Sequence, residues 1–250
     1  MKNIIFLLLS LFVYAGLSVL GLSSTTASTV SLLALFAVLA ACYYRQDGSA
    51  GKAKVETKVV GITGTIASGK SLVGKLLEEA GVPVLDTDHI SRDVQKNDQE
   101  VQAALRARFG EGVFKPTGEL DRKALGKIVF DDKSALSDLN KIMHPAIMRE
   151  CRKRIAALGP VPLVTVQVPL LFEAGLQNEY DEIWVVTASD AVVRERLKAR
   201  DGISDEEASK RINAQFPQQK KIDGADFVID NSGDIEFTRR QVLHLLKIKR

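Results

Sequence analysis

Gly64-Thr65-Ile66-Ala67-Ser68-Gly69-Lys70-Ser71 is the stretch of this sequence that decides its fold. It matches the pattern G-x-x-x-x-G-K-[ST], in which backbone N–H groups surround the phosphates of a nucleotide. The glycines permit tight turns, Lys70 is positioned to reach the β- and γ-phosphates, and the hydroxyl of Ser71 is a candidate ligand for Mg²⁺. The pattern therefore predicts a binding site for a nucleoside triphosphate.

The residues on either side of this loop support the interpretation. A short run rich in β-branched residues, 58–63, precedes the loop, and apolar residues recur at helical spacing from Leu72 to Leu77 after it. The order strand, loop, helix places the phosphates at a helix N-terminus, where the helix dipole and free N–H groups attract anions.

Short strand patterns alternate with helical patterns through the rest of the chain, which predicts an α/β fold. Parallel strands with helices on both faces give a three-layer core with the phosphate loop at the edge of its sheet. A long helical stretch from 99 to 158 interrupts the alternation, and we expect it to form a helical substrate-binding subdomain. The expected strands are 58–63, 82–85, 163–168, 182–186 and 227–229, and the expected helices are 69–80, 99–109, 122–130, 134–158, 190–198, 205–213 and 235–248.

Composition limits the classes of protein to which this chain can belong. The 250 residues are 46% hydrophobic, which is enough for a substantial core. The net charge of +3 comes from residues 1–58, and the remainder holds 29 Lys and Arg against 29 Asp and Glu. A neutral domain gives no support for a nucleic-acid partner. Two cysteines cannot form a disulfide framework, which favours a reducing, cytosol-like compartment.

The N-terminal segment is apolar and has no charged side chain between Asn3 and Tyr44. Two stretches, 4–22 and 30–44, approach the length that spans a bilayer. Basic residues on both outer sides favour a hairpin with the kinase domain facing the cytoplasm. We therefore expect a membrane anchor at 1–45, a linker at 46–57 and a kinase-like domain at 58–250. A cleaved signal peptide with one span and an organelle-targeting segment remain alternatives.

Two carboxylates follow the second expected strand, Asp86 and Asp88. Ligands of open α/β sheets bind beyond the carboxyl ends of the strands, so these side chains should face the phosphate loop. We expect Asp88 to orient the attacking hydroxyl and accept its proton. Asp86 is a second candidate for substrate binding, with a helix N-cap as the alternative.

A basic helical segment later in the chain is interpreted as part of a mobile lid. Arg196 and Arg200 lie four residues apart, on one helix face, and are candidates to neutralise charge on the transferring phosphoryl group. Arg194 and Lys198 fit a solvated helix face. His144 is isolated, and Cys151 and His89 lack the ligand spacing of a zinc site.

These features together resemble the dephospho-CoA kinase family, and the resemblance covers residues 59 to about 242. Pro-Leu-Leu-Phe-Glu after a strand, with His-Pro upstream and Ile-Asp-Asn near the end, is far more specific than the phosphate loop. The matching segments are 85–88, 120–122, 129–130, 143–145, 168–173, Arg196 with 200–201, 214–215 and 225–231.

The resemblance implies transfer of the γ-phosphoryl group of ATP to the ribose 3′-hydroxyl of dephospho-CoA, with Mg²⁺ bound at Ser71. It implies catalytic roles for Asp88, Lys70 and Arg196. ATP would contact Gly64, Thr65, Ile66, Ala67, Ser68, Gly69, Lys70, Ser71, Leu72, Arg196, Arg200 and Asn231, and the acceptor would contact Asp86, Asp88, His144, Pro169, Leu170, Leu171 and Glu173.

The loop departs from the common family pattern at three positions. Thr65 and Ala67 stand where glycine is common, and Leu72 stands where threonine is common. Side chains at 65 and 67 restrict the backbone angles, and Leu72 removes a hydroxyl that would reach a phosphate. We therefore expect an altered affinity for ATP.

Other functions are compatible with a phosphate loop. Another small-molecule kinase acting on a nucleoside or nucleotide is the main alternative. A membrane-tethered GTPase is disfavoured, because Asn140-Lys141 is not followed by the aspartate that reads guanine. A nucleotide-binding scaffold without activity is disfavoured by the intact Lys70, Ser71 and Asp88. The sequence leaves the oligomeric state open.

Overall fold

The computed structural model describes residues 56–248, and these residues build a five-stranded sheet between two layers of helices. All strand pairs are parallel, and the order is β2-β3-β1-β4-β5. The strand that leads into the phosphate loop is therefore central. The strands are β1 (Lys58–Gly64), β2 (Val84–Asp86), β3 (Leu163–Gln167), β4 (Glu182–Thr187) and β5 (Phe227–Asp230).

The period-two pattern of the strands sends alternate side chains into two separate cores. In β1, Val60 and Ile62 lie in one core, whereas Val59 packs against the other. In β4, Trp184 and Val186 belong to the first core, and Ile183 and Val185 belong to the second. A sheet buried on both faces explains why the strands read as nearly continuous apolar runs.

One face of the sheet is covered by α3 (Lys70–Glu79) and α11 (Ile235–Ile248), which contact each other. Val73, Leu76 and Leu77 recur at helical spacing and are buried on α3. Trp184 of β4 is completely buried and packs edge-on against Phe227. This packing fixes α3, and with it the helix N-terminus at the phosphate loop, against the sheet.

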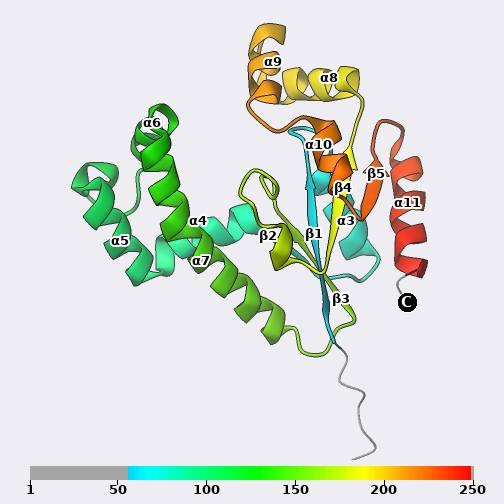
Figure 1. Cartoon of the computed structure of the whole chain (residues 1–250), viewed down its shortest axis with the longest axis horizontal. Coiled ribbons are helices and arrows are strands. Elements are labelled where there is room, and N and C mark those ends of the chain that lie inside the picture. The colour runs from blue at the N-terminus through cyan, green and yellow to red at the C-terminus, as the bar shows by residue number, and fades with distance from the viewer. Residues whose placement is uncertain (1–55, 249–250) are drawn as a thin grey trace, which may run out of the picture. The chain divides into compact units, whose positions relative to one another are not determined.

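Helices α4, α5 and α7 contribute buried side chains to the other core, and together with α6 they extend beyond it as a helical subdomain (Figure 1). The longest helix, α7, contacts α4, α5 and α6. Asp86, Asp98, Asp121 and Asp132 each cap one of these four helices through side-chain oxygens. The helices are α4 (Thr87–Asn97), α5 (Gln99–Phe109), α6 (Arg122–Asp131) and α7 (Lys133–Ala157), with a 3₁₀ turn, η1 (Glu111–Val113), after α5.

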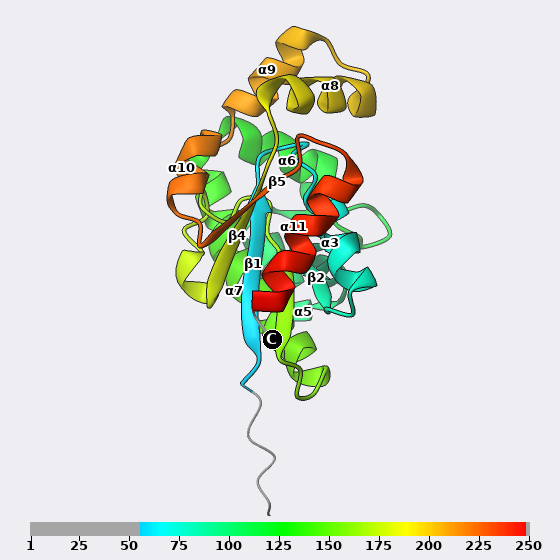
Figure 2. The same ribbon diagram turned by 90° about the vertical axis from the view of Figure 1, so that its right-hand side faces the viewer.

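Helices α8 (Asp190–Asp201) and α9 (Asp205–Asn213) lie beyond the carboxyl end of β1, away from the sheet (Figures 1 and 2). Gly202 ends α8 in the left-handed conformation, φ 66°, and allows the sharp turn between them. The chain then returns to the sheet through α10 (Gln218–Asp223). This placement fits the predicted lid.

The predicted fold class is confirmed, but two helices were not predicted. In α4 only Ile90 and Val94 are buried, so the apolar stripe is too short to mark a helix in the sequence. With six residues, α10 is shorter than the window in which a helical period is visible. Both helices carry residues of the candidate site.

The predicted membrane spans, 4–22 and 30–44, lie outside the described residues, as do the anchor 1–45 and most of the linker 46–57. Among residues 56–248, no helix is long and apolar enough to cross a membrane.

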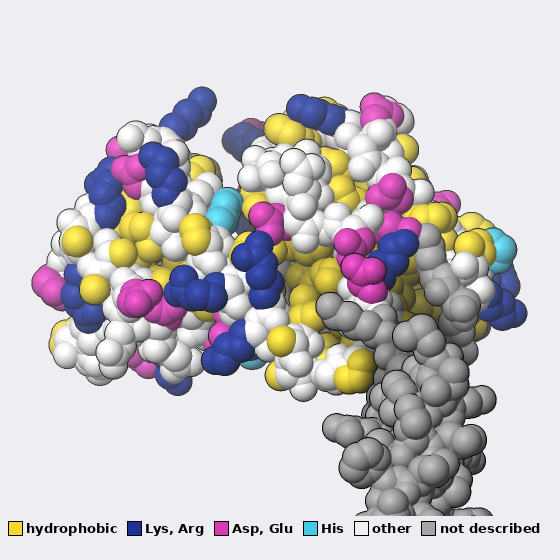
Figure 3. Space-filling model, turned by 60° about the horizontal axis from the view of Figure 1, so that its bottom comes forward, with side chains coloured by type: hydrophobic (Ala, Val, Ile, Leu, Met, Phe, Trp, Pro, Cys, Tyr) yellow, Lys and Arg dark blue, Asp and Glu magenta, His cyan; other side chains and the backbone are white. Residues whose placement is uncertain are grey.

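Charges of both signs are interspersed over the surface. Figure 3 shows acidic and basic side chains side by side, with isolated hydrophobic patches between them, on the face at the amino ends of the strands. Many are paired in the structure, for example Arg154 with Asp93 and Glu150. This face offers no extended basic surface.

Candidate active site

The phosphate loop connects β1 to α3 at the carboxyl edge of the sheet, and its two glycines are required by space. A Cβ atom on Gly64 would lie 2.2 Å from the backbone oxygen of Val186 and 2.7 Å from Oγ of Ser68. A Cβ on Gly69 would lie 1.9 Å from Nδ2 of Asn231. Both glycines also have positive φ angles, 156° and 102°. The loop therefore folds tightly over β4 and against Asn231, as its sequence pattern predicts.

Helix α3 begins directly at Lys70, so the loop ends on a helix N-terminus. The N–H groups of Leu72 and Val73 both donate to the carbonyl of Gly69. Ser71 is exposed in the first turn, where its hydroxyl is free to approach a ligand. Leu72, by contrast, packs partly against the core, which accounts for an apolar residue at this position.

Lys70 folds back over the loop that precedes it. Its Nζ donates hydrogen bonds of 3.0 Å to the carbonyls of Gly64 and Thr65. Burial and the charge of Lys221 lower the pKa of Lys70 to about 8, although Asp88 and Glu173 act to raise it. Arg200 acts to lower it as well, so charges from four segments of the chain influence this ammonium.

Thr65 and Ala67, two of the three positions at which the loop departs from the common family pattern, have different backbone conformations. Ala67 takes a left-handed conformation, φ 57°, and is the only residue other than glycine with positive φ in the described part of the chain. Thr65 does not take such a conformation; it is buried, and its hydroxyl faces Oε1 of Gln218 at 3.5 Å. The restriction of backbone angles that was predicted for positions 65 and 67 therefore applies to Ala67.

Replacing Ala67 by glycine should raise the free energy of unfolding by about 0.5–1 kcal/mol, because the left-handed conformation penalises a Cβ atom. Chemical denaturation measures the change. Ala103 is a matched control, since it lies exposed inside α5, where the same replacement should destabilise by a similar amount. A loss of stability in Ala67→Gly equal to that in Ala103→Gly would contradict the assignment of backbone strain.

The two predicted carboxylates occupy different positions at the start of α4. Asp86 is the N-cap, and its Oδ1 accepts from the N–H groups of Asp88 (2.8 Å) and His89 (3.4 Å). The side chain of Asp88 lies in the first turn of α4. Burial raises the pKa of Asp88, as does the charge of Asp86, whereas Arg92 and Lys70 lower it. Asp88 is thus the carboxylate whose charge acts on the loop lysine, and Asp86 caps its helix.

The predicted lid arginine reaches the loop from α8. Nη1 of Arg196 is buried, has no hydrogen-bond partner within residues 56–248, and lies 3.7 Å from the position of a Cβ on Gly69. Oγ of Ser68 is buried without a partner as well. Two unsatisfied donors beside the phosphate loop fit a site that receives oxygen atoms from a ligand.

Asn231 lies behind the loop. Its Nδ2 donates to the carbonyl of Ser68 at 2.8 Å, and its Oδ1 accepts from the hydroxyl of Thr238 at 2.9 Å. The side chain is buried, so its amide ties the loop to α11. The predicted contact of Asn231 with ATP stays a prediction beside this supporting role.

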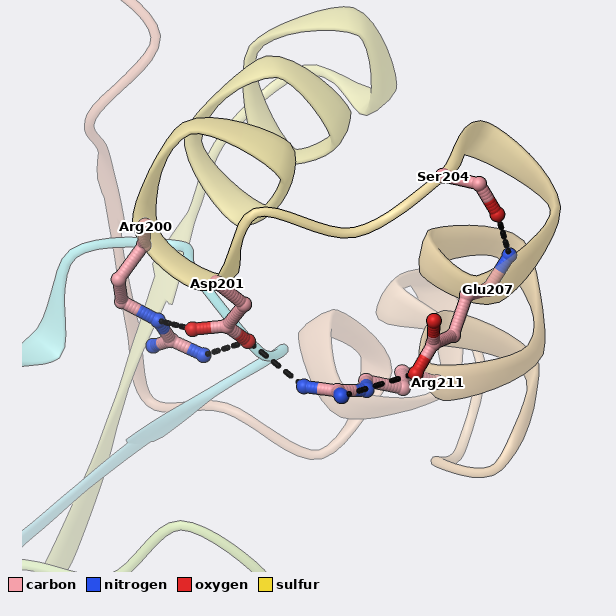
Figure 4. Close-up of polar contacts among 5 residues, drawn as sticks. All are labelled: Arg200, Asp201, Ser204, Glu207 and Arg211. Carbon is pink, nitrogen blue, oxygen red and sulfur yellow. Dashed lines mark hydrogen bonds and ion pairs between the residues drawn. The ribbon is translucent and has the colours of Figure 1, made fainter.

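Arg200 belongs to an ion-pair network that joins α8 to α9 (Figure 4). Its Nε and Nη2 donate to the carboxylate of Asp201 at 2.7 and 3.1 Å, and Arg211 donates to the same carboxylate at 2.7 Å. Arg211 also pairs with Glu207 at 3.1 Å. Arg194 and Lys198 both pair with Asp205, which confirms that they serve the surface of the lid.

The acceptor side of the candidate site lies across from the lid. His144 and Glu173 line one open groove of about 560 Å³, together with Lys133, Asn140 and Lys141. Burial lowers the pKa of His144, so the imidazole is neutral near pH 7. The structure thus brings His144 of α7 and Glu173 of the segment after β3 together, as the resemblance implies.

Pro169, Leu170 and Leu171, which follow β3, differ in exposure. The carbonyl of Pro169 accepts a hydrogen bond from the Thr63 hydroxyl at 3.3 Å, and Leu170 is exposed. Leu171 is completely buried and packs in the core beneath the sheet. Its side chain supports the segment from below, and its predicted contact with the acceptor stays a prediction.

Three polar residues that follow α9 make contacts that the sequence did not indicate, although one of them, Gln215, lies in a segment that matches the family. Oε1 of Gln215 accepts from the loop N–H of Ile66 at 2.7 Å, and Oε1 of Gln218 accepts from the N–H of Ala188 at 3.3 Å. Lys221 is completely buried, and its Nζ lies 2.8 Å from Oε1 of Glu173. A lysine one turn after Gln218 in a short helix gives no sequence signal that distinguishes it from a surface residue.

A family model described as dephospho-CoA kinase matches residues 58–236, which include every site residue described above. This chain belongs to the dephospho-CoA kinase family. The dephospho-CoA kinase of Carboxydothermus hydrogenoformans is 42% identical over 191 residues, which cover 76% of this chain and 93% of that protein. The dephospho-CoA kinase of Geobacillus kaustophilus is 40% identical over 193 residues, which cover 76% of this chain and 96% of that protein. The predicted enzyme class, a kinase, is confirmed.

Solved structures agree with the family. A crystal structure of a Thermus thermophilus protein matches with a TM-score of 0.69 and 36% identity, over 77% of this chain and 98% of that one. A dephospho-CoA kinase from Campylobacter jejuni matches with a TM-score of 0.58 and 26% identity, over 77% and 96%.

The family assignment also corrects the predicted membrane localisation. The family model begins at residue 58, and the matched region makes up 93% and 96% of the two dephospho-CoA kinases compared. Residues 1–45 thus contribute nothing to the resemblance on which the function rests. Neither a membrane location nor a bilayer partner is retained.

Proposed function

We propose that this chain transfers the γ-phosphoryl group of ATP to the ribose 3′-hydroxyl of dephospho-CoA and releases coenzyme A and ADP. The observation that carries the proposal lies at the carboxyl edge of the sheet, where Nη1 of Arg196 and Oγ of Ser68 are buried beside the phosphate loop without a partner in residues 56–248. The phosphate loop supplies one side of this edge and the groove of His144 and Glu173 supplies the other.

Asp88 accepts the proton of the acceptor hydroxyl as its oxygen attacks the γ-phosphorus and the bond to the β–γ bridging oxygen breaks. Its raised pKa suits a proton acceptor, since burial and Asp86 make its carboxylate more basic. Lys70 and Arg196 stabilise the negative charge on the transferring group. Closure of α8 and α9 brings Arg196 and Arg200 over the phosphates and excludes water.

The residues present fit a magnesium ion. The hydroxyl of Ser71 is exposed at the N-terminus of α3, next to the loop, and oxygen ligands are those that Mg²⁺ prefers. Within residues 56–248 no cluster of three His, Cys, Asp or Glu side chains is arranged to hold a metal. Ser71 would therefore hold Mg²⁺ together with phosphate oxygens and water, and the ion would neutralise phosphate charge.

An acceptor screen tests the proposed function. The purified chain is given ATP and Mg²⁺ with dephospho-CoA, with nucleosides or with nucleoside monophosphates, and ADP release is followed. We expect release that depends on dephospho-CoA and exceeds that with every other acceptor. Equal or faster release with a nucleoside or nucleotide would favour the alternative small-molecule kinase.

The pH dependence of ATP binding tests the role of Lys70. Because the pKa of Lys70 is lowered to about 8, the charged form is present below this pH and is lost above it. The Kd for ATP should therefore rise above pH 8, by up to about tenfold per pH unit. In Lys70→Arg the rise should disappear, since arginine stays charged. A rise that persists unchanged in the arginine variant would assign it to another group.

A further inference from the structure

We propose that Lys221 is a positioning residue that holds Glu173 in the acceptor groove and thereby determines acceptor affinity. This inference rests on the proposed function, because it assumes that Glu173 contacts the acceptor. Lys221 itself touches neither substrate.

The first observation is the pairing of two buried charges. Lys221 is completely buried, and its Nζ lies 2.8 Å from Oε1 of Glu173. Oε2 of Glu173 is also buried, and it has no hydrogen-bond partner in the described part of the chain. One carboxylate oxygen is thus fixed by the lysine, and the other remains available to a ligand at the groove.

The second observation is that one short segment joins both halves of the site. The N–H of Phe216 donates to Oε1 of Glu173 at 3.0 Å, the same oxygen that faces Lys221. Gln215, directly before Phe216, holds the loop N–H of Ile66. Residues 215–221 therefore contact the phosphate loop at one end and the acceptor groove at the other.

The third observation concerns charge. Burial acts to raise the pKa of Glu173, but the ion pair with Lys221 and the hydrogen bond from the N–H of Phe216 outweigh it and hold the pKa below its usual range. Without Lys221, the carboxylate would lose the partner that keeps it ionised and oriented. Removal of one member of a buried ion pair leaves an uncompensated charge. We therefore expect the carboxylate of Glu173 to move away from its position in the groove.

Lys221→Met tests the proposal, because methionine keeps the length of the side chain and removes the charge. We expect the KM for dephospho-CoA to rise about tenfold, as misplacement of a substrate-positioning group does, while the KM for ATP stays within about twofold. Lys153→Met is the matched control. Lys153 lies exposed on α7 and pairs with Glu150, outside the contacts of residues 215–221, so its replacement should leave both KM values unchanged.

A double-mutant cycle with Glu173→Gln separates positioning from stability. If Lys221 acts through Glu173, the acceptor KM of Glu173→Gln/Lys221→Met should equal that of Glu173→Gln within about twofold. The double variant buries no unpaired charge, so this comparison remains possible if Lys221→Met does not fold.

An equal rise in the KM for dephospho-CoA and in the KM for ATP would overturn the proposal. It would also be overturned if Lys221→Met raised the KM for dephospho-CoA by the same factor in the wild-type chain and in the Glu173→Gln variant. An active wild-type chain is required in either case. Absence of activity of the wild-type chain toward dephospho-CoA would instead refute the proposed function.

Discussion

Asp88→Asn should lower kcat about a thousandfold, within the range expected for loss of a general base, while the Kd for ATP stays nearly unchanged. Asparagine keeps the shape of the side chain but cannot take a proton from the acceptor hydroxyl. The helix itself should survive, because the N-cap of α4 is Asp86 and not Asp88. Steady-state kinetics and ATP titration of the purified variant measure the two quantities.

Asp98→Asn is the matched control for this prediction. Asp98 caps α5 as Asp86 caps α4, and asparagine caps a helix as well as aspartate does. The control should therefore retain kcat. Parallel losses of kcat and ATP affinity in Asp88→Asn would assign Asp88 to folding or to metal binding instead of proton transfer.

Gly64→Ala should weaken ATP binding strongly, because the added Cβ atom would displace the phosphate loop. A Cβ atom at this position meets a backbone oxygen at 2.2 Å, which cannot move aside as the end of a flexible side chain can. We expect an unfolding free energy lower by about 1–3 kcal/mol, as in other overpacked sites. The affinity for ATP should fall about 100-fold, since a displaced loop no longer directs its N–H groups at the phosphates.

The control for this prediction is Gly126→Ala. Gly126 lies within α6, and a Cβ there meets nothing within 4 Å. Because alanine favours a helix over glycine, the control should be more stable by about 0.5–1 kcal/mol and bind ATP as the wild type does. ATP affinity of Gly64→Ala equal to that of the wild type would show that the loop tolerates a different path over β4.

The sequence allowed prediction of the features that depend on local pattern. The phosphate loop, all five strands and the long helices were predicted because their residue types and periods are set by backbone geometry and by burial on one face. The place of Asp88 beyond the carboxyl edge follows from a parallel sheet. The same reasoning correctly separated Arg194 and Lys198 from the site.

Features that arise from contacts distant in the chain could not be predicted in this way. Lys221 and Glu173 are 48 residues apart in number, and only the folded chain shows that their charges meet. The burial of Asn231 behind Ser68 depends on how β5 and α11 pack. The burial of Leu171 in the core likewise depends on how the segment after β3 packs.

The chemical identity of the product tests the central claim most directly. The purified wild-type chain is incubated with dephospho-CoA, ATP and Mg²⁺, and the products are identified by mass spectrometry and phosphorus NMR. We predict coenzyme A and ADP in equal amounts, with the new phosphate on the ribose 3′-oxygen. Absence of a phosphorylated product, or a phosphate on any other position, would contradict the account.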